Sequence, residues 1–138
     1  MITHDFGVES IEQWKTVADM LGIRTKEFAG GVESCGFSLD VLSRVLELGF
    51  IKPEYKFNDS PTVKTFLEFG QRAETFGATV EYIGFLESKY RKDACLVVTG
   101  VKVTSFPDSV GLVLDFSQTF HDADEFTTNA SLLRAWYD

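Results

Sequence analysis

The sequence predicts an α+β fold, in which three N-terminal helices pack on one face of an antiparallel β-meander that is followed by a short helix and a last strand. Two observations predict this class. Apolar residues recur at helical spacing in three segments before residue 78, and from Ala78 the apolar period changes to two, which is typical of strands. Helices separated in sequence from an antiparallel sheet are the mark of the α+β class.

The composition indicates one globular domain over residues 1–138. The chain has 138 residues, of which 44% are hydrophobic, and it contains 13 phenylalanines. A chain of this length buries enough surface for a core without metal or disulfides, and its apolar content excludes a disordered protein. We expect the phenyl rings to fill a solid core; the alternative is a curved sheet that encloses an apolar pocket.

The first expected helix begins at Ser10. Ser10 and Gln13 form a capping box, and Gly22 ends the helix. Its apolar positions keep helical spacing: Ile11, Trp14, Val17, Ala18 and Leu21. Residues 23–37 show no sustained period and are interpreted as a loop or a short irregular strand.

The second expected helix begins after Ser38 and ends before Gly49, which suits the left-handed position that follows a helix. Its apolar stripe is formed by Leu39, Leu42, Val45 and Leu46, and Val41 and Leu48 widen it. This wide apolar arc predicts a central helix that is covered on more than one side.

The third expected helix has Ser60 as N-cap and Pro61 as its first residue, and Gly77 closes it. Gly70 lies inside the helix, where glycine costs about 1 kcal/mol relative to alanine. We therefore expect another helix or strand to approach the backbone closely at Gly70.

Three strands are expected next, over residues 78–87, 94–104 and 110–114. The charged turn 88–93 and the turn at Pro107-Asp108 join them, and connections this short favour antiparallel neighbours. Past Leu114 the pattern fits either a longer strand or a helix. We favour a short helix over 116–124, with Asp115 and Gln118 as a capping-box variant, and then a last strand within 131–138.

The net charge of −8 argues against nucleic acid or an anionic membrane as a partner, because both require clustered Lys and Arg. Residues 108–138 carry six acids and a single base, Arg134. This acidic end is explained by solubility or by docking of a basic protein. The two cysteines, Cys35 and Cys95, have no metal-ligand spacing, and the first residues lack a signal-peptide pattern, so we expect a cytoplasmic protein with reduced thiols.

The densest polar cluster is the run from His121 to Glu125. On a helix, His121, Asp124 and Glu125 would share a face, where they are candidates for acid–base chemistry or for binding a cation. The competing interpretation is a solvated acidic turn. The sequence has no complete catalytic set and no cofactor signature, so we predict neither a cofactor nor a metal site, and leave open whether the chain is an enzyme.

The leading functional hypothesis is association with another protein or with a second copy of the chain. The residues expected to make the contact are Asp122, Asp124, Glu125, Trp136 and Tyr137. Exposed aromatic residues near a chain end are good interface anchors. The alternative is a small enzyme or ligand-binding domain with a pocket between the sheet and the third helix, which would use His121 and the nearby carboxylates.

Overall fold

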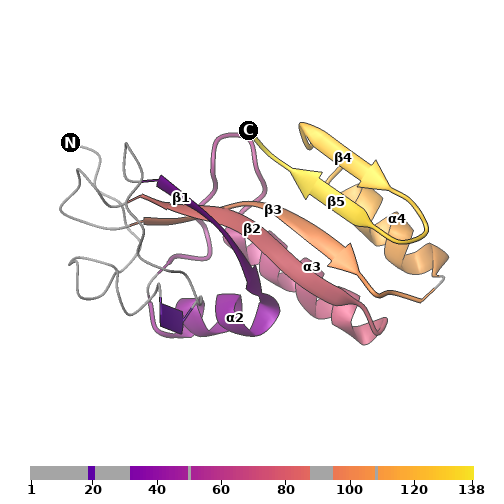
Figure 1. Cartoon of the computed structure of the whole chain (residues 1–138), viewed down its shortest axis with the longest axis horizontal. Helices are drawn as coiled ribbons and strands as arrows, with labels where there is room; N and C mark the ends of the chain where they lie inside the picture. Colours follow the sequence, from indigo (N-terminus) through magenta and orange to yellow (C-terminus); the bar gives the residue numbers. More distant parts are fainter. Residues whose placement is uncertain (1–18, 21–31, 50, 88–94, 108) are drawn as a thin grey trace.

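The structure is a computed structural model that describes residues 19–20, 32–49, 51–87, 95–107 and 109–138. It has mixed helices and one five-stranded antiparallel sheet, as the predicted α+β class requires (Figure 1). The strands are β1 (Val32–Ser38), β2 (Thr79–Glu87), β3 (Cys95–Thr104), β4 (Glu125–Thr128) and β5 (Leu133–Trp136), in the spatial order β1-β2-β3-β5-β4. The helices are α2 (Leu39–Glu47), α3 (Val63–Thr75) and α4 (Val110–Thr119).

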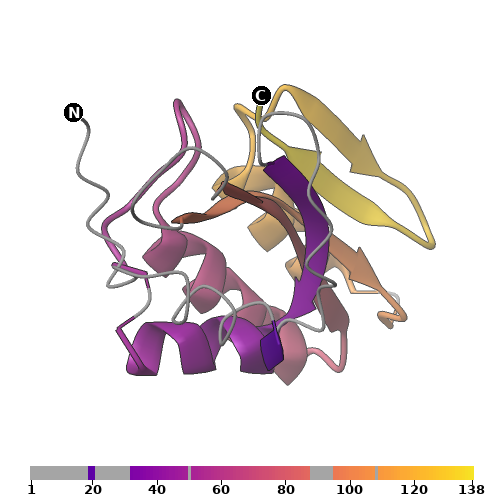
Figure 2. The ribbon, with the colours of Figure 1, turned by 60° about the vertical axis from the view of Figure 1, so that its left-hand side comes forward.

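The core lies between the sheet and the helices α3 and α4, which run behind β2 and β5 in the view of Figure 1. Helix α2 packs beside α3, as the turned view in Figure 2 shows. The core face of the sheet is formed by alternate strand residues: Val80, Tyr82, Val101, Val103, Leu133 and Ala135. The rings of Phe66, Phe69, Phe116 and Phe120 from the helical side are fully buried. Phenylalanines therefore fill the space between the layers.

The predicted order of elements was wrong. A strand, β1, precedes α2 within the range that we interpreted as a loop or an irregular strand, and two helices then separate β1 from its neighbour β2. The first expected helix lies outside the described residues except for Asp19 and Met20, which are helical. The described sheet is therefore not a meander that follows three helices.

Helix α2 begins and ends where the sequence predicted. The Val41 amide donates a hydrogen bond to the Ser38 hydroxyl oxygen at 3.2 Å, and Gly49 has a φ of 76°, which glycine adopts without strain. Leu48, however, is 54% exposed, so the apolar arc of α2 is not buried at its C-terminal end.

Helix α3 begins two residues later than predicted. Its N-cap is Thr62, whose hydroxyl oxygen accepts a hydrogen bond from the Thr65 amide at 3.2 Å. Ser60 is buried before the helix, where its hydroxyl oxygen accepts from the Phe57 amide. The close approach expected at Gly70 is confirmed, since a Cβ atom there would overlap the Tyr82 hydroxyl oxygen of β2.

The third expected strand, 110–114, is instead the first half of α4. Ser109 caps this helix, because its hydroxyl oxygen accepts a hydrogen bond from the Leu112 amide at 3.3 Å. Leu112, Phe116 and Phe120 are four residues apart, and all three are fully buried. The predicted helix over 116–124 has the wrong bounds: only its first four residues are helical, because α4 ends at Thr119, and Asp115 lies inside α4 instead of capping it.

The predicted last strand is confirmed as β5, which pairs with β3 on one side and with β4 on the other. Strand β4, which has four residues and lies at the edge of the sheet, was not predicted from the sequence.

Candidate functional site: the exposed face of helix α4

Helix α4 presents apolar side chains to solvent as well as to the core. The helix has the apolar-rich sequence VGLVLDFSQT. Two of its apolar residues, Val110 and Leu114, are 74% and 54% exposed. A surface helix normally carries charged and polar residues on its outer face. This helix has one charged residue, Asp115, so most of its outer face lacks charge.

Two aromatic rings extend this apolar surface on either side of α4. A Cβ atom at Gly111 would lie 3.3 Å from the ring of Phe76, which follows α3 and is 36% exposed. On the other side, Phe126 of β4 is 41% exposed and stacks on Phe116 with ring centroids 5.3 Å apart. We call the four residues Phe76, Val110, Leu114 and Phe126 the α4 face. They are four of the five large apolar side chains that are exposed among the described residues, and the fifth is Leu48.

An open cavity of about 480 Å³ adjoins this face. Its lining comes from the segment before α4, from α4 itself and from the turn between β4 and β5: Phe106, Ser109, Val113, Thr128, Asn129 and Ala130. Neither His121 nor any residue of α3 lines this cavity, so it is not the predicted pocket between the sheet and the third helix. There, the rings of Phe66 and Tyr82 pack edge to face at 6.2 Å.

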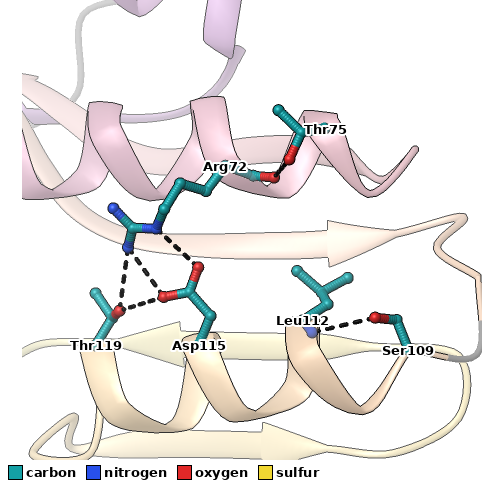
Figure 3. Close-up of polar contacts among 6 residues, drawn as sticks. All are labelled: Arg72, Thr75, Ser109, Leu112, Asp115 and Thr119. Atoms are coloured by element: carbon teal, nitrogen blue, oxygen red, sulfur yellow. Dashed lines mark hydrogen bonds and ion pairs between the residues drawn. The ribbon is translucent and has the colours of Figure 1, made fainter.

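The single charge on α4 is neutralised by α3. The Arg72 Nε and one guanidinium nitrogen donate to the two carboxylate oxygens of Asp115 at 2.8 and 3.0 Å, and Thr119 donates to the same carboxylate at 3.2 Å (Figure 3). The hydrogen bond with Asp115 raises the pKa of Arg72. This bidentate pair joins the two helices and neutralises Asp115, the one charged residue of α4.

The acidic residues predicted to make a contact lie just beyond the C-terminal end of α4. The Tyr137 hydroxyl donates to Asp122 at 2.8 Å, and the Asp138 amide donates to Asp124 at 2.8 Å. Glu125 accepts from Arg134 of the neighbouring strand at 2.8 Å. Asp122, Asp124 and Glu125 are nevertheless exposed, and within the described part of the chain only Glu125 of the three has a salt-bridge partner.

The two C-terminal aromatic residues point to opposite faces of the sheet. Tyr137 is 1% exposed, and burial together with the hydrogen bond to Asp122 raises its pKa above the usual value. Its ring contacts Phe66 edge to face, so Tyr137 is part of the core and does not lie on the surface. Trp136 is partly exposed on the face away from the helices, where its indole lies against Gly100.

The structure places His121 on the surface in the turn after α4. Among the described residues no cluster of three or more His, Cys, Asp or Glu side chains is arranged to hold a metal ion. The described helices also include none that is both long and apolar enough to span a membrane. The side chains of Cys35 and Cys95 lie outside what the structure describes.

Sequence reasoning missed the α4 face because it assigned residues 110–114 to a strand. In a strand, Leu112 and Leu114 would share one face, whereas in the helix Leu112 is buried and Leu114 is exposed. The available signal was the spacing of four between Leu112, Phe116 and Phe120, together with a serine just before Val110.

Comparisons with protein-family models, with curated proteins and with solved structures gave no match to this chain.

Proposed function

We propose that this protein acts by binding another protein, and that the α4 face is the contact surface. The observation that carries the proposal is the gathering of Phe76, Val110, Leu114 and Phe126 around one uncharged helix face. Large apolar side chains exposed together around one element are typical of interaction sites. Singly scattered apolar residues, such as Leu48 on α2, need no such explanation.

The surroundings of the α4 face fit an interface. Interfaces combine an apolar centre with a polar rim, and here the paired Arg72–Asp115 group and the exposed Asp124 form parts of such a rim. Asp122 and Asp124 thereby keep a place in the proposed contact surface, next to the C-terminal end of α4. Trp136 and its register partner Glu125 lie on the other face of the sheet, and Tyr137 is buried, so none of these three residues belongs to this surface.

The proposal retains a cytoplasmic location and a partner that is a protein, including a second copy of the chain. The net charge of −8 supports a protein partner over nucleic acid, since phosphate binding depends on clustered cations.

Photocrosslinking in the cells that make the protein tests this proposal. A photoreactive diazirine amino acid is placed at Leu114 in one variant and at Leu48 in a matched variant, because both side chains are 54% exposed. We expect a discrete crosslinked product from position 114 and none from position 48, since only position 114 lies in the contact surface. The mass of the product distinguishes a second copy of the chain from another protein.

The control is a Phe126→Gln substitution in the variant labelled at position 114, which should weaken the product by removing one apolar anchor. Equal crosslinking from both positions, or the absence of a discrete product from position 114, would show that the α4 face is not a specific contact surface.

A further inference from the structure

We infer that the partner of the α4 face is a basic amphipathic helix, an inference that rests on the proposed function and identifies the chemistry of its partner. Two properties of the face support this inference. The first is the hydrogen-bonding capacity of its backbone, and the second is the position of the carboxylates that have no cationic partner among the described residues.

The backbone argument favours a helical partner. The exposed part of α4 is the side of a helix, whose peptide groups are bonded within the helix itself. The side of α4 therefore offers no free backbone donors or acceptors to an extended chain, and among the described strands only β4, with four residues, borders this face with an unpaired edge. A bound helix satisfies its own backbone hydrogen bonds, and it can lay an apolar stripe on an apolar surface. Val110 and Leu114 are one helical turn apart and match the spacing of such a stripe.

The cavity beside α4 provides room for an anchor side chain. Its lining includes the partly buried apolar residues Phe106 and Val113, and its volume is about 480 Å³. Hot-spot residues of protein interfaces characteristically fill pockets of this kind. A large aliphatic or aromatic residue on the partner helix would therefore enter between α4 and the β4–β5 turn.

The charge argument favours a basic partner. Past the C-terminal end of α4, Asp122 and Asp124 have no cationic partner among the described residues, and Asp138 hydrogen bonds to this same turn. The C-terminal end of a helix also carries a partial negative charge. Near the apolar residues, by contrast, Asp115 is neutralised by Arg72. A partner helix lying along α4 would contact the apolar residues with one part and the negatively charged turn past the C-terminal end of α4 with another. The part of the partner that lies on this turn must therefore carry basic residues.

A synthetic peptide pair tests this inference directly on the purified full chain. One peptide of about 18 residues, or about 27 Å as a helix, carries leucine at helical spacing and lysine elsewhere. The second peptide has glutamate in place of every lysine. By titration calorimetry we expect the lysine peptide to bind at least about tenfold more tightly than the glutamate peptide. Circular dichroism should show that the lysine peptide becomes helical on binding.

Matched variants separate a specific site from general attraction to an acidic protein. Leu114→Gln should weaken binding of the lysine peptide about tenfold, and Leu48→Gln should leave it unchanged. Asp122→Asn with Asp124→Asn removes two charges but retains the oxygens that accept from Tyr137 and Asp138, and it should weaken binding and reduce its salt dependence. Glu47→Gln with Glu54→Gln removes two exposed charges elsewhere and should have a smaller effect.

Two results would overturn the inference: equal affinity for the lysine and glutamate peptides, or equal losses in the Leu114→Gln and Leu48→Gln variants. These failures are distinguishable from failure of the proposed function. If position 114 still crosslinks to a discrete protein in cells, the α4 face binds a partner, and that partner is not a basic helix. A crosslinked product with the mass of two chains would identify a second copy as the occupant.

Discussion

Gly70 is the residue at which helix α3 and strand β2 approach closely enough to exclude a side chain. The position lies inside α3, where alanine would be the better helix former, but a Cβ atom there would overlap the Tyr82 hydroxyl oxygen and would also lie 2.9 Å from Leu39. The Tyr82 hydroxyl donates to the Phe66 carbonyl oxygen at 2.6 Å, so it cannot move away without losing a buried hydrogen bond. The glycine thus permits the contact between α3 and β2.

We predict that Gly70→Ala lowers the free energy of unfolding by about 1–3 kcal/mol, the usual cost of overpacking a core. Gly111→Ala is the matched control on α4, because the nearest atoms to its Cβ belong to the half-exposed ring of Phe76, which can shift. The control should leave stability unchanged or slightly higher. Urea unfolding measures both values, and equal effects of the two substitutions would contradict the packing described for Gly70.

At the scale of elements, the sequence predicted those whose boundaries are set by local chemistry. Ser38 and Gly49 delimit α2, and the period of two over residues 79–87 identifies β2, because both signals act within a few residues. The signals around α4 conflicted. Residues 110–114 fit a strand by composition, and the contacts that decide for a helix are made by Phe116 and Phe120 with Phe69 of α3. Contacts between distant parts of the chain are not visible in one sequence, and for this reason the α4 face was missed.

The Arg72–Asp115 pair that joins α3 and α4 provides a prediction at this scale. A double-mutant cycle with Arg72→Ala and Asp115→Ala should give a coupling energy of about 0.5–1 kcal/mol, because the pair is bidentate but partly exposed. The coupling should fall in 1 M salt, where the Debye length is about 3 Å.

The exposed Glu81–Lys102 pair, with a separation of 3.5 Å, serves as the control and should show coupling near zero. A coupling in the Arg72–Asp115 cycle no larger than that of the control would mean that the pair does not link the two helices.

For the whole molecule, composition and period together predicted the α+β class but not the order of its elements. The pairing of β1 with β2 spans two helices, and β5 inserts between β3 and β4. Such long-range pairings depend on which apolar faces meet, and one sequence does not show this. The expectation that phenyl rings fill the space between the layers agrees with the buried cluster of Phe66, Phe69, Phe116 and Phe120. Val110 and Leu114, by contrast, are apolar residues that lie outside this packed core and are exposed to solvent.

Our proposal requires that a partner protein covers the α4 face in the cell. Backbone hydrogen exchange, measured on the free protein and on the complex purified from the source cells, tests it most directly. We expect slower exchange in the complex over residues 110–118 and at Phe126, with α2 unchanged. Unchanged exchange throughout α4, with protection confined to α2 or to the strand face that carries Trp136, would contradict it.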